Sequence, residues 1–340
     1  MGLAERLGLA VPLVQAPMAG VATPELAAAA SNAGALGGLG LAAMSPAQAA
    51  EAMAATRALT DRPFGVNLFC HRPARRDPAR EAAWLELMRP AFEAADAPVP
   101  TGMAEIYIPF PGNDEMQAVI EAANPAVVSF HFGLPQPDQL DRLRAMGAVL
   151  LGSATSLAEA RAIRDAGLDG IVAQGWEAGG HRGMFDPDGP DERLSTRALL
   201  ELLLPVGLPV IAAGGIMTAE DVRRMLDHGA DLVQCGTAFL RCPESATQPS
   251  HKALMSTGRT VMTRSISGRP ARSLENRLTA LPSDLAPDYP LPYDPAKALM
   301  AAARKAGIAG YNADWAGTGA AQAVEEPAAQ VVARLTEGLR

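Results

Sequence analysis

Eight short apolar segments limit the fold of this chain more than any other feature. Each ends at glycine, proline or polar residues, and most lead into an alanine- and leucine-rich stretch of helical character. They are residues 13–16, 35–39, 64–69, 127–132, 149–152, 170–173, 209–213 and 232–235. Nearly continuous apolar strands that alternate with helices form parallel sheets covered on both faces. Eight such units predict a (β/α)8 TIM barrel in the α/β class, with an open doubly wound sheet as the competing fold.

Helix-start signals support this alternation of strands and helices. Thr23 and Ser45 each place a capping hydroxyl directly before a proline, and Thr218 precedes an acidic first turn. The segment 104–108 looks like one further strand. We interpret it as an excursion between the third and fourth units that brings Tyr107 near the barrel mouth.

The pattern changes after Phe239. The following 70 or so residues are rich in Pro, Ser, Thr, Arg and Met, and residues 289–293 indicate extended or looping structure. Amphipathic helical periodicity returns over residues 322–339. The predicted division is a barrel over residues 1–240, a smaller inserted substrate or lid region over 241–310, and a C-terminal helix over 311–340 that closes the barrel.

Composition and charge exclude several classes of function. Asp and Glu outnumber Lys and Arg by 37 to 29, which gives a net charge of -8, and no basic run exists to bind nucleic acid. No apolar run reaches the ~18 residues that suggest a membrane span. The three cysteines, Cys70, Cys235 and Cys242, form no CxxC motif, so we expect neither disulfides nor a metal site. We expect a cytoplasmic monomer or homodimer.

The segment 174–183 (Gln-Gly-Trp-Glu-Ala-Gly-Gly-His-Arg-Gly) holds the densest cluster of chemically useful residues. Its glycines let the backbone approach a ligand closely, and His181 can move a proton near neutral pH. Active sites of barrels lie at the carboxyl ends of the strands. We therefore predict an active-site loop with His181 as the catalytic residue, rather than a structural turn. His131 ends another strand and fits a site residue and a packing residue equally well.

Two glycine turns follow the seventh and eighth strands. Gly214 and Gly215 precede the helix start at Thr218, and Gly236 and Thr237 follow the eighth strand. Barrels commonly hold a phosphate between these two loops, with backbone N–H groups and a helix N-terminus as donors. The alternative is that these glycines only turn the chain out of the barrel. Two such turns on adjacent strands favour a phosphate site.

The predicted phosphate fits a mononucleotide better than a dinucleotide. No G-x-G-x-x-G motif opens a βαβ unit, so a Rossmann-bound dinucleotide is not supported. A mononucleotide lying across the barrel mouth would place its ring over segments 15–20 and 65–67, which offer backbone and amide groups. FMN suits this arrangement, because its isoalloxazine needs an apolar face and hydrogen-bonding groups at the pyrimidine edge.

Four segments resemble the nitronate monooxygenase family, formerly called 2-nitropropane dioxygenases, and in particular its bacterial class I. They lie in the family's order and spacing at residues 14–20, 65–69, 174–183, and the pair 212–216 with 233–240. A less specific likeness extends through residues 268–272, 276–277 and 315–317. The resemblance implies a barrel with an inserted substrate domain, FMN as cofactor, and oxidation of alkyl nitronates by O2. Propionate 3-nitronate is the favoured substrate.

The resemblance also implies roles for individual residues. His181 would be the family's active-site histidine, and Tyr107 and His131 would line the substrate pocket. The residues that would contact FMN are Ala16, Pro17, Met18, Asn67, Gln174, Gly179, Gly180, Gly214, Gly215, Gln234, Gly236 and Thr237. The segment 314–318 departs from the family's usual pattern. Motifs do not place the pocket residues of region 241–310, which leaves the substrate open.

The sequence leaves two roles open for His181. It can take the α-proton of a neutral nitroalkane, or it can act as an electrostatic partner of a preformed nitronate. Two other functions also fit parts of the pattern. One is an FMN-dependent NAD(P)H:quinone or enoyl reductase, against which the Gly-Gly-His-Arg-Gly setting argues. The other is a non-catalytic flavin- or phosphate-binding protein, against which the grouping of His131, His181 and Tyr107 at one mouth argues.

Overall fold

The computed structural model describes residues 2–339, and a ring of parallel strands forms its centre. Its strands are β1 (Leu13–Gln15), β2 (Gly37–Gly40), β3 (Phe64–Phe69), β4 (Val127–His131), β5 (Val149–Ala154), β6 (Gly170–Gln174), β8 (Val210–Ala213) and β9 (Leu232–Cys235). They are paired in the order β1-β9-β8-β6-β5-β4-β3-β2. A parallel bridge between Val14 and Leu36, which directly precedes β2, closes the ring. The predicted (β/α)8 barrel is confirmed, and the open doubly wound sheet is excluded.

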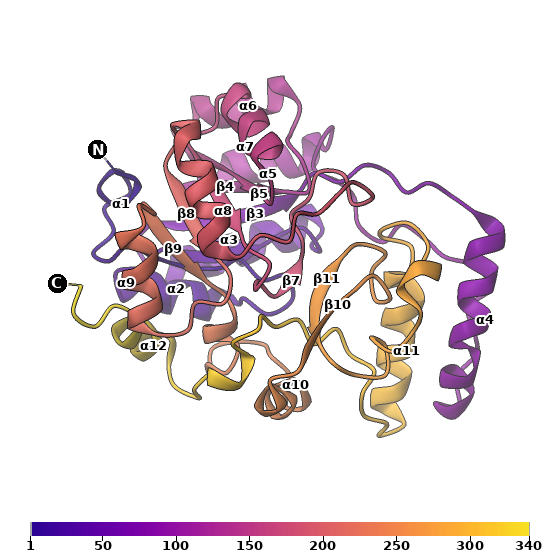
Figure 1. Ribbon diagram of the computed structural model, residues 1–340. Coiled ribbons are helices and arrows are strands. Elements are labelled where there is room, and N and C mark those ends of the chain that lie inside the picture. Colours follow the sequence, from indigo (N-terminus) through magenta and orange to yellow (C-terminus); the bar gives the residue numbers. More distant parts are fainter. Residues whose placement is uncertain (1, 340) are drawn as a thin grey trace.

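Helices cover the outside of this ring (Figure 1). They are α2 (Pro24–Asn32), α3 (Pro46–Leu59), α5 (Asp114–Ala123), α6 (Pro137–Ala145), α7 (Leu157–Asp165), α8 (Thr196–Leu203), α9 (Ala219–Asp227) and α12 (Ala328–Leu335). The predicted starts are confirmed, because the hydroxyls of Thr23, Ser45 and Thr218 each accept a hydrogen bond from the backbone N–H three residues later. No helix within residues 2–339 is long and apolar enough to cross a membrane.

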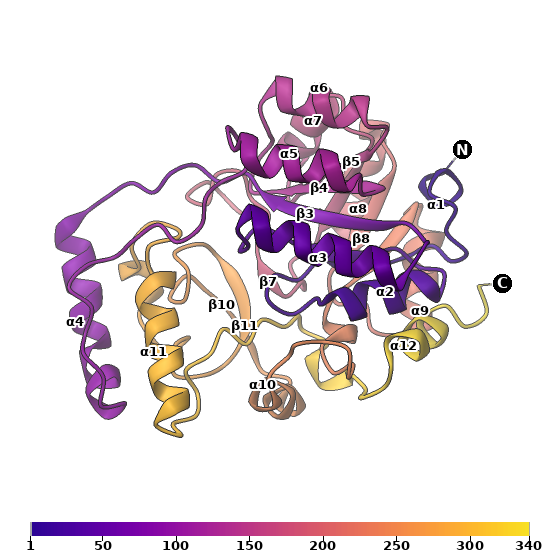
Figure 2. The ribbon, with the colours of Figure 1, turned by 180° about the vertical axis from the view of Figure 1, so that it is seen from behind.

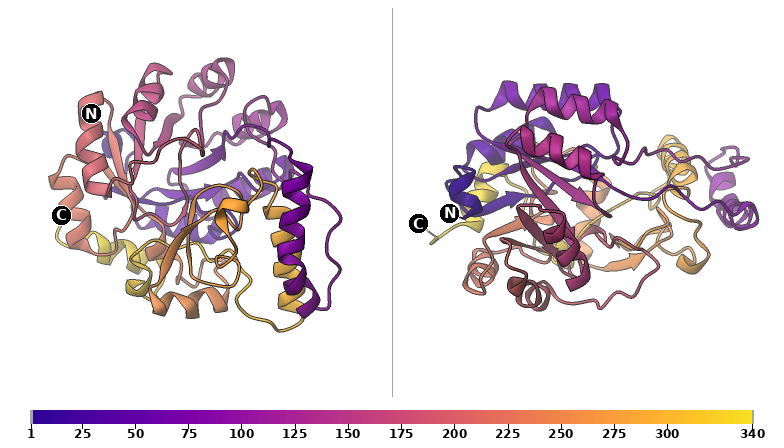
Figure 3. Two further views of the ribbon diagram at one scale, coloured as in Figure 1. Left: turned by 45° about the vertical axis from the view of Figure 1, so that its right-hand side comes forward. Right: turned by 90° about the horizontal axis from the view of Figure 1, so that it is seen from above.

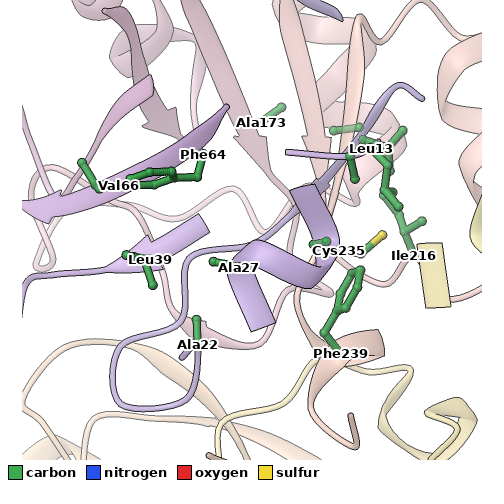
Figure 4. Packing of buried hydrophobic residues seen from close by; sticks show 14 of the residues in the cluster. Leu13, Ala22, Ala27, Leu39, Phe64, Val66, Ala173, Ile216, Cys235 and Phe239 are labelled. Atoms are coloured by element: carbon green, nitrogen blue, oxygen red, sulfur yellow. The ribbon is translucent and has the colours of Figure 1, made fainter. Parts of the chain in front are cut away.

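Two apolar layers hold the barrel together. Leu13, Phe64 and Val66 belong to the layer between strands and helices. Figure 4 shows the side chains of this layer. Other strand residues, such as Val127 and Leu232, form a separate cluster with the short N-terminal helix α1 (Leu3–Arg6). This second cluster fills the N-terminal end of the barrel and leaves the opposite end for the cavity described below.

A smaller region lies beside the open end of the barrel. Its helices α4 (Pro78–Ala94) and α11 (Tyr293–Lys305) run side by side at the edge of the molecule (Figures 2 and 3). A three-stranded antiparallel sheet and the short helix α10 (Pro249–Leu254) lie between them and the barrel (Figure 1). The sheet consists of β10 (Thr260–Thr263), β11 (Ala271–Leu274) and β7 (Gly180–His181) in the order β10-β11-β7.

The predicted strand at residues 104–108 is wrong, because these residues form an irregular segment. Tyr107 is buried in the core of the smaller region, whereas its neighbour Ile108 is 74% exposed. The segment is therefore a loop that buries one aromatic side chain in a core, not a paired strand. The expectation that Tyr107 reaches the barrel mouth is nevertheless confirmed, since it lines the cavity there.

The predictions near the C-terminus are confirmed only in part. Residues 289–292 form turns, as the looping prediction states, whereas Tyr293 already begins α11, whose first turn contains Pro295. A proline is tolerated there because the first N–H groups of a helix have no partner within it, so the proline marks a helix start. The C-terminal helix starts at Ala328 rather than at residue 322, because Pro327 would interrupt a longer helix.

The core of the smaller region extends beyond the predicted insertion of residues 241–310. It includes Trp84 and Phe92 of α4 together with Phe132, which follows β4, and Leu299 of α11. The chain between β3 and α5 crosses to this core and returns to the barrel, and β7 joins the region's sheet from the loop after β6, so the region is built from three separate stretches. The predicted boundaries at residues 240 and 310 therefore do not coincide with the edges of this core.

Candidate active site

One large cavity, of about 480 Å³, opens at the carboxyl ends of the barrel strands. All of the predicted site residues line it: Ala16, Pro17, Met18, Asn67, Tyr107, His131, Gln174, Gly179, Gly180, His181, Gly214, Gly215, Gln234, Gly236 and Thr237. They come from loops far apart in the sequence, and the barrel brings them to a single space. Their contacts with a ligand stay predictions.

Polar side chains on the inward face of the strands form the floor of this cavity. Along β4 the inward residues change from apolar Val127 to Ser129 and His131, and the last two line the cavity. Asn67 of β3 donates through Nδ2 to the Ser129 carbonyl over 3.2 Å and to its hydroxyl over 2.9 Å. The Asn67 Oδ1 receives no hydrogen bond from residues 2–339, so it is available to a ligand donor.

The turns after β8 and β9 present unused backbone donors. Within the described residues, the N–H groups of Gly215, Ile216, Gly236 and Thr237 have no hydrogen-bond acceptor. Gly236 and Thr237 stand at the start of a short 3-10 helix, η2 (Thr237–Phe239). The Thr237 hydroxyl accepts from the Gly317 N–H over 2.9 Å, which leaves its own hydrogen free to donate. Unpaired N–H groups in two adjacent turns are donors that an anion can use.

Some glycines of the site are required by the packing of loops rather than by space for a ligand. A Cβ on Gly179 would lie 2.4 Å from the backbone carbonyl carbon of Ala316, and a Cβ on Gly214 would lie 2.9 Å from the Ala178 nitrogen. Gly180 differs, since nothing lies within 4 Å of its Cβ position, but its φ of 74° favours glycine. The glycines therefore hold the loops close together at the cavity wall.

His181 lies where the barrel meets the smaller region. It forms β7 with Gly180 and pairs with Ala271 of β11, so its backbone belongs to the antiparallel sheet. Its carbonyl oxygen accepts from Gln174 Nε2 over 2.8 Å and is 3.1 Å from Nε2 of His131. Both of these side chains come from barrel strands. The position of His181 is therefore fixed both by β11 of the smaller region and by two side chains of the barrel.

The loop that carries His181 is held by buried polar contacts. Gln174 also accepts from the Gly183 N–H over 2.7 Å, so both ends of its amide are engaged within the protein. Arg182 is 1% exposed and pairs with Asp191 through two contacts of 3.0 and 2.8 Å. Gln174 was predicted to contact the cofactor. The structure gives it a positioning function, and a direct cofactor contact stays a prediction.

The imidazole of His181 lies among aromatic rings. Trp315 is closest, with 5.0 Å between ring centroids, and Phe132 and Tyr289 follow at 5.6 and 5.8 Å. Burial lowers the pKa of His181 to about 3, and the nearby His131 and Arg269 act in the same direction. Burial likewise lowers the pKa of His131 to about 4. Both rings are therefore neutral at pH 7, and each has one ring nitrogen with a free lone pair.

Comparison with known proteins identifies the family. The family model described as nitronate monooxygenase matches residues 3–338. The chain belongs to the nitronate monooxygenase family. It is 49% identical to the nitronate monooxygenase of Paraburkholderia phytofirmans, over 98% of this chain and 93% of that protein. It is 46% identical to the nitronate monooxygenase of Pseudomonas aeruginosa, over 98% and 97%. The protein is thus an oxidoreductase, and the resemblance seen in the sequence is confirmed.

Solved structures support both the fold and the family. Nitroalkane oxidase from Streptomyces ansochromogenes superposes with a TM-score of 0.91 and 37% identity, covering 99% of this chain and 97% of that one. FabK from Thermotoga maritima superposes with a TM-score of 0.73 and 27% identity, covering 98% and 94%. The architecture of barrel and smaller region is therefore shared over nearly the whole chain.

The sequence prediction for this member of the nitronate monooxygenase family missed the cavity wall that the smaller region supplies. Tyr293, Lys297 and Arg304 line the cavity from one face of α11, at helical spacings of four and seven residues. Trp315 donates through Nε1 to the Tyr293 hydroxyl over 3.1 Å, and Lys297 Nζ lies 4.7 Å from the ring centre of Tyr107. The spacing was a usable signal, but it was hidden because no helix was predicted there.

Proposed function

We propose that this protein oxidises alkyl nitronates with O2 through bound FMN, giving a carbonyl product and nitrite or nitrate. One observation carries the proposal. The neutral ring of His181 lines the same cavity as the unused backbone donors of the β8 and β9 turns. A proton-accepting group and an anion site thus share one space of about 480 Å³, as a base beside a phosphate-bearing cofactor requires.

The residues of the barrel fit FMN. The N–H groups of Gly215, Ile216, Gly236 and Thr237 would hold its phosphate. The free Oδ1 of Asn67 would accept a hydrogen bond from the pyrimidine edge of the isoalloxazine. The remaining predicted contacts come from Ala16, Pro17, Met18, Gln174, Gly179, Gly180, Gly214 and Gln234, which line the same cavity. FMN, when bound, supplies the electron acceptor that no side chain of the protein provides.

The smaller region supports an anionic substrate. Lys297 and Arg304 lie at the exposed rim of the cavity, and neither has a carboxylate partner among residues 2–339. Two unpaired cations at one rim stand out in a chain of net charge -8, and they attract anions to the mouth. Propionate 3-nitronate carries a nitronate and a carboxylate, so it suits this rim better than a neutral nitroalkane does. Tyr107 and His131 would line its pocket.

His181 performs a different step for each form of substrate. With a neutral nitroalkane, the imidazole takes the α-proton, and the electron pair of the broken C–H bond stays on the substrate as a nitronate. With a substrate that arrives as a nitronate, no proton needs to be removed. The ring then serves as a polar contact within an otherwise aromatic enclosure.

Anaerobic mixing of the purified protein with propionate 3-nitronate and with NADH, in separate cuvettes, tests the proposal. We expect a yellow protein with non-covalent FMN, whose flavin absorbance bleaches quickly with the nitronate and slowly with NADH. Rapid bleaching by NADH alone would instead support the NAD(P)H:quinone or enoyl reductase. A colourless protein that FMN does not reconstitute would overturn the proposal.

A further inference from the structure

Ser267 makes a contact with His181 that the proposed function does not use. The serine is 1% exposed, and its Oγ lies 2.9 Å from Nε2 of the His181 ring. Among residues 2–339 this hydroxyl is the only hydrogen-bond partner of the ring. The other ring nitrogen, Nδ1, has no hydrogen-bond partner among these residues. It is not among the fully buried atoms, and His181 lines the cavity. The two nitrogens therefore have different surroundings.

The hydrogen bonds around Ser267 depend on which nitrogen of His181 carries the hydrogen. The Arg269 N–H donates to Ser267 Oγ over 3.3 Å, and Oγ can donate to the Arg269 carbonyl, also over 3.3 Å. A hydroxyl donates one hydrogen bond and accepts two. If His181 Nε2–H donates to Oγ, the hydroxyl uses its full capacity. If Oγ donates to Nε2 instead, one acceptor position of Oγ stays empty and the Arg269 carbonyl loses this donor.

We propose that Ser267 is a positioning residue that keeps neutral His181 in the tautomer with hydrogen on Nε2. This arrangement satisfies the buried hydroxyl completely, as buried polar groups generally are. Nδ1 then presents its lone pair to the cavity. The inference rests on the proposed function in one respect: it makes Nδ1 the atom that accepts the α-proton of a neutral nitroalkane. The resulting imidazolium keeps its Nε2–H bond to Ser267.

The backbone holds both residues in register. Ser267 precedes a tight turn that leads into β11, the strand whose Ala271 pairs with His181. Within this turn Gly268 has a φ of 92°, and a Cβ there would lie 2.6 Å from the Pro287 carbonyl oxygen. The turn therefore has little room to move. A fixed hydroxyl opposite a fixed ring is what selection of one tautomer requires.

Nitrogen NMR of the holoenzyme labelled with 15N-histidine tests the proposal without any substrate. The His181 signals are assigned by their loss in His181→Asn. We expect Nε2 to show a one-bond coupling to hydrogen and Nδ1 to show the shift of an unprotonated ring nitrogen. A protonated Nδ1 in the wild-type protein at pH 7 would overturn the proposal. This result is readable whichever substrates the enzyme oxidises, so its failure is distinct from failure of the proposed function.

Ser267→Ala tests the consequence for catalysis. We expect mixed tautomers in the NMR spectrum and a roughly 3- to 10-fold loss in kcat/KM for a neutral nitroalkane, the size expected for one neutral hydrogen bond. Oxidation of the preformed nitronate should change much less. An equal loss for both substrates, with unchanged His181 signals, would reduce Ser267 to a structural residue and overturn the proposal.

Ser265→Ala is the matched control. Ser265 is as buried as Ser267 and donates to the Leu278 carbonyl over 2.8 Å, without contacting His181. We expect this variant to leave the His181 tautomer and the ratio of nitroalkane to nitronate oxidation unchanged. If it altered both as Ser267→Ala does, a general loosening of the turn would explain the data and the proposal would fail.

Discussion

The two walls of the cavity offer different chemical groups to a ligand. The barrel wall offers mainly backbone N–H groups, at Gly215 and Gly236 in the turns after β8 and β9, together with the side-chain amide of Asn67 within β3. The wall from the smaller region offers long side chains, such as Lys297 and Tyr293, from a single helix. Main-chain recognition depends on the fold, whereas side-chain recognition changes with one substitution. We therefore propose that the barrel binds the cofactor, which stays the same, and that the smaller region binds the substrate, which can differ.

Replacing His181, which lies between the two walls, should have the largest effect. Asn keeps a hydrogen-bonding group but does not take up a proton at neutral pH. We expect His181→Asn to lower oxidation of a neutral nitroalkane by roughly 10²–10⁴-fold, and of the preformed nitronate much less. Steady-state kinetics with both substrates measures this. The control is His228→Asn, since His228 caps the C-terminal end of α9 and does not line the cavity. Equal losses would make His181 an electrostatic group rather than a base.

A charge on the barrel wall should release the cofactor. In Gly215→Asp a carboxylate would stand where we place the phosphate. Unit charges about 4 Å apart repel by about 4 kcal/mol at an effective dielectric constant of about 20, which weakens binding by more than roughly a hundredfold. The ratio of flavin to protein absorbance after dialysis measures it.

Two controls separate charge from strain in this experiment. Gly215 has a φ of 70°, and a Cβ there would lie 2.9 Å from the Glu177 Cβ, so Gly215→Ala reports the steric cost alone. Gly147 has a φ of 80° with nothing within 4 Å of its Cβ position, and Gly147→Asp reports strain far from the cavity. If Gly215→Asp retains full FMN occupancy, the phosphate binds elsewhere and the contrast between the walls fails.

A change on the other wall should affect the substrate and not the cofactor. Lys297→Met keeps the length of the side chain and removes its charge. We expect KM for propionate 3-nitronate to rise roughly two- to fivefold, as for an exposed charge pair, with the difference shrinking at high salt. FMN content and KM for a neutral nitroalkane should stay the same. Lys305→Met, on the same helix but outside the cavity lining, is the control, and loss of FMN in Lys297→Met would contradict the assignment.

The smallest expected effect is that of pH. Burial lowers the pKa of His181 to about 3, so the neutral, proton-accepting ring is lost only as pH falls toward that value. Between pH 8 and pH 5 we expect no loss of nitroalkane oxidation from protonation of His181. The pH profile of kcat/KM for a neutral nitroalkane measures this. A decline with an apparent pKa near 6.5 that disappears in His181→Asn would show that the ring is more solvated than the aromatic enclosure suggests.

The two walls also differ in how far the sequence predicted them. The barrel wall was predictable because its parts are local: each apolar run ends in the glycines or polar residues that line the cavity, as at Gly214 and Gln234. Tyr293 was not predicted, because it lines the cavity from α11, which packs on α4, a helix about 200 residues earlier in the chain. Ser267 was not predicted, because it meets His181 only through the turn before β11, 86 residues further along the chain. No local pattern records that contact, and the prolines before α11 concealed the helix.

The two-residue strand β7 places a limit on how parts of this enzyme can be exchanged. A graft that replaced residues 241–310 alone would remove β11 and leave His181 without its partner strand. It would also leave α4 without α11 beneath it. A working chimera must therefore transfer the loop around His181 and the stretch containing α4 together with the C-terminal stretch. We therefore expect the substrate range to depend on three separate stretches of chain, which a single crossover does not transfer together.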